Sequence, residues 1–188
     1  MRKGVFALFA ASAALLTAAD VPRPSPDLVV HLNGGGKATV GQYRGKVVAV
    51  CFILTTCPHC QKTIGFLIKA QNDYGPRGFQ VLASAIQGGA EQAVPGFIQE
   101  FHPTFPVGFN DVRTAMDYMQ HPPFLNPHMP LLAFVDRQGV IRAQHEGDDP
   151  KFFSDDLEQN IRKQVEELLK PAAGSKGAAK KAVPKKQS

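Results

Sequence analysis

Residues 46–54 form a continuous apolar run rich in β-branched side chains, between Gly45 and two threonines. A run so short and so uniformly apolar is typical of a strand that is buried on both faces, as in a parallel sheet. The following segment changes to a spacing of three to four residues, with apolar positions at Ile64, Leu67, Ile68 and Ala70. This spacing predicts a helix, which Gly75-Pro76 ends.

Strands and helices then continue to alternate along the chain. Residues 79–86 predict a second strand, and residues 92–101 predict a helix that is interrupted near Pro95. Strand, helix, strand and helix in this order make a βαβ unit with a right-handed crossover. Residues 112–119 predict a further short helix.

Turn residues predict two β-hairpins. Behind an extended, proline-rich lead-in at residues 20–27, the first hairpin connects residues 28–32 with residues 38–40 through Asn33 and three glycines. The second hairpin connects residues 131–135 with residues 140–145. In its turn, Gly139 stands at a position that needs a positive φ.

A last helix is predicted from Asp149-Pro150, a capping residue followed by proline at the first helical position. Its core-facing stripe is Phe153, Leu157, Ile161, Val165 and Leu168. The elements together predict an α/β fold, in which a central mixed β-sheet is flanked by helices on both faces and carries an N-terminal β-hairpin.

Both ends of the chain differ from this pattern. In residues 1–19, a basic pair, an apolar run of 13 residues and small residues before Asp20 are typical of a secretory signal peptide. An uncleaved membrane anchor is the alternative, although a spanning helix needs ~20 apolar residues. Residues 170–188 contain mainly alanine, glycine, proline and lysine, and predict a disordered basic tail. The sequence therefore predicts one folded domain at residues 20–169.

The net charge of +5 comes from these ends, because eight basic residues lie in them. Without these residues the middle of the chain carries a charge of about −3. A mildly acidic domain gives no argument for nucleic-acid binding, so we expect no nucleic-acid partner.

Two of the three cysteines, Cys57 and Cys60, form a C-x-x-C motif where the buried strand meets the helix. Cys57 is expected at or just before the first helical residue, and Pro58 suits the first turn because its missing N–H costs nothing there. Free backbone N–H groups and the helix dipole favour a thiolate, which predicts Cys57 as the reactive sulfur. Cys60 lies one turn further, so we expect a shielded thiol that resolves a mixed disulfide on Cys57.

His59 lies inside the motif, and an imidazolium there would further favour the Cys57 thiolate and make the disulfide more oxidising. Cys51 lies within the apolar strand, which predicts a buried, unreactive thiol. His31, His102 and His145 are expected to be surface or loop histidines. We expect no cofactor.

Two other readings of the dithiol remain. His59, His121 and His128 could complete a copper or zinc site with the two cysteines, in a copper-binding or metallochaperone protein. The pair could also be an inert structural disulfide, although so short a loop gains little from closure.

Three stretches resemble the thioredoxin-like superfamily, and within it the exported TlpA/ResA-type thiol–disulfide oxidoreductases, which are related to the AhpC/TSA redoxins. The stretches are Gly45-Lys-Val-Val-Ala-Val-Cys-Phe52, Cys57-Pro-His-Cys60 and Met129-Pro-Leu-Leu-Ala-Phe-Val-Asp136 with the following Gly139-Val-Ile. The resemblance covers residues 28–169. It implies a thioredoxin-like fold and disulfide exchange with protein thiols or disulfides in the periplasm or another extracytoplasmic compartment.

The resemblance also implies roles for single residues. Pro130 should be a cis-proline beside the dithiol, and Met129 should touch the substrate. Cys51 stands where thioredoxin has a buried acid, and Thr63 stands where many TlpA-type proteins have glutamate. We further expect a redox partner that recycles the dithiol, and membrane contact only if the signal segment stays uncleaved.

A peroxiredoxin-like peroxidase is the alternative enzyme on the same fold. Its pattern requires a threonine three residues before the reactive cysteine. Leu54 holds that position before Cys57, and Cys57 itself holds it before Cys60. The motif therefore favours disulfide exchange.

Overall fold

The structure, a computed structural model, describes residues 20–171, so the predicted signal peptide and nearly all of the basic tail lie outside the described residues. Eight strands form one sheet. They are β1 (Arg23–Pro24), β2 (Val29–His31), β3 (Lys37–Thr39), β4 (Val47–Ile53), β5 (Phe79–Ala85), β6 (Val107–Phe109), β7 (Leu131–Val135) and β8 (Val140–Glu146). Their order across the sheet is β1-β8-β7-β4-β5-β6-β2-β3.

The sheet is mixed, as the sequence predicts. Strands β4, β5 and β6 run parallel to one another, whereas β7 pairs with β4 in the antiparallel direction. The two predicted hairpins are present as β2–β3 and β7–β8, and Gly139 has a φ of 82° in the second turn. The N-terminal hairpin joins the sheet where His31 pairs with Phe109 of β6.

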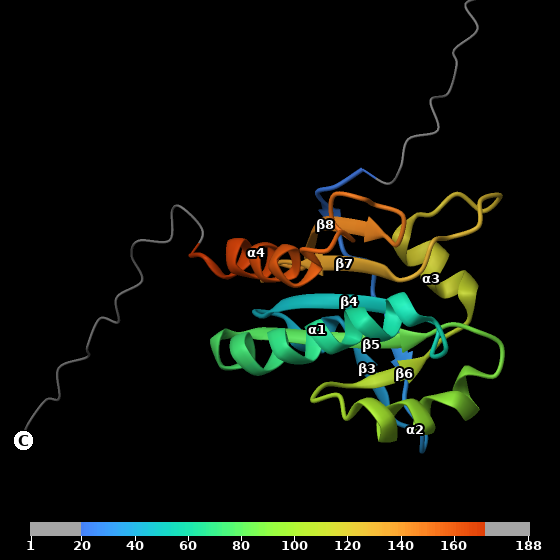
Figure 1. The fold of residues 1–188 in the computed structure, drawn as a ribbon. Helices are drawn as coiled ribbons and strands as arrows, with labels where there is room; N and C mark the ends of the chain where they lie inside the picture. The colour runs from blue at the N-terminus through green and yellow to red at the C-terminus, as the bar shows by residue number, and fades with distance from the viewer. Residues whose placement is uncertain (1–19, 172–188) are drawn as a thin grey trace, which may run out of the picture.

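Helices cover both faces of the sheet. Helices α1 (Pro58–Tyr74), α2 (Ala90–Phe101) and α4 (Leu157–Leu169) pack on one face, and α3 (Val112–Met119) packs on the other with the N-terminal hairpin. Figure 1 shows α1 and α4 side by side in front of the sheet. All seven residues of β4 are buried, because alternate side chains enter the two opposite cores.

Two helices differ from the predictions. Helix α2 continues through Pro95 instead of being interrupted there. Pro95 is exposed and removes only one backbone hydrogen bond, while the burial of Val94 and Phe97 holds the helix on the sheet. Helix α4 begins at Leu157, not near Asp149.

Asp149 stabilises a turn in place of a helix start. Its carboxylate accepts hydrogen bonds from the backbone N–H groups of Lys151 at 3.0 Å and Phe152 at 3.2 Å. The turn buries Phe152 against Phe134, so Phe152 enters the core in place of the predicted Phe153. Long-range packing thus decides where this helix begins.

Strands β1 and β6 are absent from the predictions. Both are short, and β1 pairs with β8 through only two residues, within the stretch predicted to be an extended lead-in. A two-residue strand carries no periodic pattern, so its pairing depends on the partner. No helix within residues 20–171 has the length and apolar character needed to cross a membrane.

Leu67 tests how α1 is held on the sheet. Its side chain is fully buried in the core beneath α1, so Leu67→Ala should reduce the free energy of unfolding by about 2–5 kcal/mol. Urea unfolding under reducing conditions measures the change. The matched control is Leu125→Ala, because Leu125 is 56% exposed and its loss should change stability by less than about 0.5 kcal/mol. Equal effects of the two variants would contradict this packing.

Candidate functional site

Cys57 lies at the junction of β4 and α1, where the sequence analysis expects it. It is the N-cap of α1, with extended φ and ψ of −81° and 120°, and Pro58 is the first helical residue. The Cys57 Sγ accepts a hydrogen bond from the backbone N–H of Cys60 at 3.4 Å. One of the free N–H groups of the first helical turn is therefore aimed at the Cys57 sulfur.

The other two thiols are fully buried. Cys60 faces the core beneath α1, and its Sγ accepts a hydrogen bond from the Leu54 N–H at 3.5 Å. Burial raises the pKa of Cys60 well above its ordinary value, and the neighbouring thiols Cys57 and Cys51 raise it further. Burial likewise raises the pKa of Cys51. Of the three free thiols, only Cys57 is partly exposed, so it is the sulfur that a second molecule can reach.

Two glutamine side chains hold the loop before Cys57. Gln87 forms hydrogen bonds with both the side chain and the backbone of Thr55. Its amide group donates to the Thr55 Oγ1 at 2.6 Å and accepts from the Thr55 backbone N–H at 3.3 Å. Gln61 donates to the Thr55 carbonyl oxygen at 2.9 Å. Sequence reasoning missed Gln87, because it lies 32 residues from Thr55 and follows a different strand.

Met129 and Pro130 precede β7, and the peptide bond between them is cis. Leu131, the next residue, pairs with Phe52 of β4. Pro130 therefore lies beside the carboxyl end of β4, which leads into Cys57. Met129 is half-buried and packs against both cores, as Cys57 does against one of them. A Cβ on Gly147 would collide with the Met129 carbonyl, so glycine is required there for β8 to approach.

The histidines occupy three different environments. His59 is exposed in the first turn of α1. His145 lies in β8, not on the surface as expected: its ring stacks on Phe152 at 3.7 Å, and its Nδ1 lies 2.8 Å from Asp149. Burial lowers the pKa of His145.

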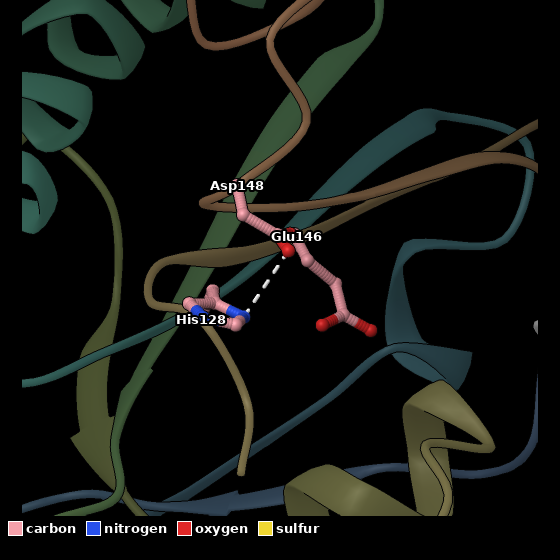
Figure 2. A group of neighbouring side chains, drawn as sticks. All are labelled: His128, Glu146 and Asp148. Atoms are coloured by element: carbon pink, nitrogen blue, oxygen red, sulfur yellow. Dashed lines mark ion pairs between the residues drawn. The ribbon is translucent and has the colours of Figure 1, made fainter. Parts of the chain in front are cut away.

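His121 and His128 lie with carboxylates and not with the dithiol. His128, Glu146 and Asp148 place their ligand atoms within 4.8 Å of one another (Figure 2). Within residues 20–171 no group of three metal-binding side chains this close includes a cysteine. The structure therefore does not assemble the metal site of dithiol and histidines that the sequence left open.

The chain is similar to proteins of known family and fold. Residues 21–161 match the family model Redoxin. The thiol-disulfide oxidoreductase ResA of Geobacillus kaustophilus is 26% identical over 155 residues, which cover 82% of this chain and 81% of that protein.

Solved structures with the same fold include two bacterial proteins. A thiol:disulfide interchange protein of the thioredoxin family from Chlorobium tepidum has a TM-score of 0.64 at 17% identity, covering 81% of this chain and 100% of that one. The thioredoxin domain of a thiol-disulfide oxidoreductase from Bacteroides vulgatus has a TM-score of 0.62 at 20% identity, covering 79% and 99%.

The environments of the three thiols predict their order of reactivity. Cys57 should alkylate faster than Cys60 or Cys51, because it is partly exposed and its sulfur faces a helix N-terminus, while burial keeps the other two protonated. Mass spectrometry of the reduced protein after brief treatment with iodoacetamide at mildly acidic pH measures the order. Cys60→Ser should retain the fast reaction. Rapid alkylation that survives in Cys57→Ser would show that the attacking sulfur is misassigned.

Proposed function

The chain belongs to the Redoxin family and has a thioredoxin-like fold, and from this premise we propose that it is a thiol–disulfide oxidoreductase acting on protein substrates through Cys57-Pro58-His59-Cys60. The observation that carries the proposal is the pairing of two unlike thiols. A partly exposed Cys57 caps α1, and a fully buried Cys60 donates its backbone N–H to the Cys57 sulfur. One accessible attacker with one shielded resolver is the arrangement that disulfide exchange requires.

In the reducing direction, the Cys57 thiolate attacks one sulfur of a client disulfide, and the other client sulfur leaves as a thiolate that takes up a proton. Cys60 then loses its proton and attacks the Cys57 sulfur. The Cys57–Cys60 disulfide forms, the second client thiol is released, and two electrons pass to the client. The oxidising direction runs through the same mixed disulfide in reverse.

The environment of Cys60 governs the second step. Burial and the two neighbouring thiols keep Cys60 protonated in the reduced protein, while the Leu54 N–H stabilises the thiolate that must form. Thr63, at the position of the glutamate in many TlpA-type proteins, donates its hydroxyl to the His59 carbonyl oxygen at 2.8 Å. The Thr63 hydroxyl is thus used by a backbone carbonyl. The group that donates to the Cys60 sulfur and can stabilise its thiolate is the Leu54 N–H.

Met129 and Pro130 are proposed to border the substrate groove. They lie beside the carboxyl end of β4, from which the chain continues to Cys57, and part of the Met129 side chain is exposed. We place the reaction in the periplasm or another extracytoplasmic compartment, since residues 1–19 have the pattern of a secretory signal and disulfides persist there. A separate redox partner then returns the dithiol to its working state.

Trapping the mixed disulfide tests the function. The wild-type chain should accelerate insulin reduction by dithiothreitol, and Cys57→Ser should return the rate to the uncatalysed one. Cys60→Ser should accumulate a covalent complex with a disulfide-bonded client, because the resolving sulfur is missing; non-reducing electrophoresis detects it. Cys51→Ala removes a fully buried thiol that no client can reach, so this variant should still reduce insulin and should accumulate no covalent complex. Activity that persists without Cys57 would refute the proposal.

His59→Ala tests whether His59 sets the redox potential. Under mildly acidic conditions, which protonate an imidazole, loss of the ring should lower the potential of the Cys57–Cys60 couple, because a positive charge favours the reduced state. His59 is exposed, so the interaction is about 1 kcal/mol or less, equivalent to about 20 mV for two electrons. Equilibration with glutathione measures the shift, which should shrink at high salt. An unchanged potential at low salt would show that the helix N-terminus acts without His59.

A further inference from the structure

A cluster of ionisable side chains lies at the end of β8, apart from the dithiol. His128 comes from the loop before β7, Glu146 is the last residue of β8, and Asp148 follows it. Their ligand atoms lie within 4.8 Å of one another, and the His128 Nδ1 lies 3.2 Å from the Asp148 Oδ2 (Figure 2).

His121 adds a fourth, buried group. Its side chain is only 4% exposed, and its Nε2 lies 3.3 Å from the Glu146 Oε2. Its Nδ1 lies 2.9 Å from the Pro122 carbonyl oxygen. A carbonyl oxygen only accepts, so the Nδ1 carries a hydrogen, and the Nε2 is the ring atom that faces the carboxylate. A histidine whose Nδ1 donates to a carbonyl oxygen and whose Nε2 is directed toward the ligand position is the usual second-shell arrangement of a metal-binding histidine.

The four side chains line one cavity of about 610 Å³. The apolar side chains of Phe124 and Leu125 also line it. The cavity adjoins the residues that the proposed function assigns to substrate binding, because His128 directly precedes Met129. Small ions can therefore reach the cluster through this cavity, and the loop before β7 forms part of the cavity wall.

We propose that His121, His128, Glu146 and Asp148 bind a divalent cation of the Zn²⁺ class. Two imidazole nitrogens and two carboxylate oxygens suit zinc, whereas Ca²⁺ and Mg²⁺ prefer oxygen ligands throughout. Ligands at about 2.0–2.1 Å from zinc in tetrahedral geometry lie about 3.3 Å from each other. The two nitrogen–oxygen distances of 3.2 and 3.3 Å are close to that separation, and the ligand atoms of His128, Glu146 and Asp148 all lie within 4.8 Å of one another.

Small side-chain rotations complete the site, since His128 and Asp148 are 65% and 57% exposed and free to turn toward the cation. The cation joins the loop of residues 121–130 to the end of β8, in addition to the hydrogen bond from the Gly147 N–H to the His128 carbonyl oxygen at 2.7 Å. It uses no sulfur ligand, unlike the dithiol site considered from the sequence. The site is independent of the disulfide chemistry proposed above.

Zn²⁺ titration of the full chain carrying Cys57→Ser and Cys60→Ser tests the site without interference from the dithiol. Isothermal titration calorimetry should show one Zn²⁺ per chain. Adding His128→Ala and Asp148→Asn should weaken binding at least tenfold. The matched control is His102→Asn, an exposed histidine in the left-handed conformation that asparagine tolerates, and it should leave the affinity unchanged.

Two results would overturn the proposal: no stoichiometric Zn²⁺ binding by the double-serine protein, or equal affinity after removal of His128 and Asp148. If circular dichroism shows that this variant does not fold, the absorption spectrum of Co²⁺ bound to the double-serine parent tests the proposal instead. Intense visible bands of tetrahedral cobalt without a sulfur-to-metal charge-transfer band support the site. Octahedral or sulfur-bound cobalt contradicts it.

Discussion

Burial of β4 on both faces is the constraint on which the remaining structure depends. The strand pairs with β5 on one side and β7 on the other, and its side chains enter two separate cores. The position of its carboxyl end is therefore fixed by both neighbouring strands. Helix α1 begins within a few residues of that point and buries Ile64 and Leu67, which places Cys57 at the surface and Cys60 in the core.

The dithiol is positioned by contacts that extend beyond its own helix. Gln61 and Gln87 satisfy the backbone and hydroxyl groups of Thr55, so the loop before Cys57 has one defined path. On the opposite side, the absence of a side chain at Gly147 lets β8 approach the Met129 carbonyl. Pairing of β4 with β7 then brings Pro130, which precedes β7, to the end of the sheet at which β4 leads into Cys57. The proposed redox site is thus a property of three strands and not of the motif alone.

Histidine shows how strongly tertiary contacts decide chemistry. His59, beside the cysteines in the chain, is exposed, while His145 is partly buried between Phe152 and Asp149 with a lowered pKa. His121 is buried and faces Glu146, 25 residues away. Three side chains of one chemical type therefore have three different electrostatic surroundings. Only the environment distinguishes the proposed tuning group His59, the packed ring of His145 and the candidate metal ligand His121.

Local sequence patterns determined β4, α1, α3, both hairpins and the placement of Cys57 at a helix N-terminus, because hydrophobic period, capping and turn residues act between near neighbours. The continuity of α2 through Pro95, the start of α4 at Leu157 and the pairing of β6 were decided by the tertiary structure. So were the clamp of Gln87 on Thr55 and the approach of His121 to Glu146. Each of these depends on the energy of a contact between segments distant in the chain, which no local periodicity carries.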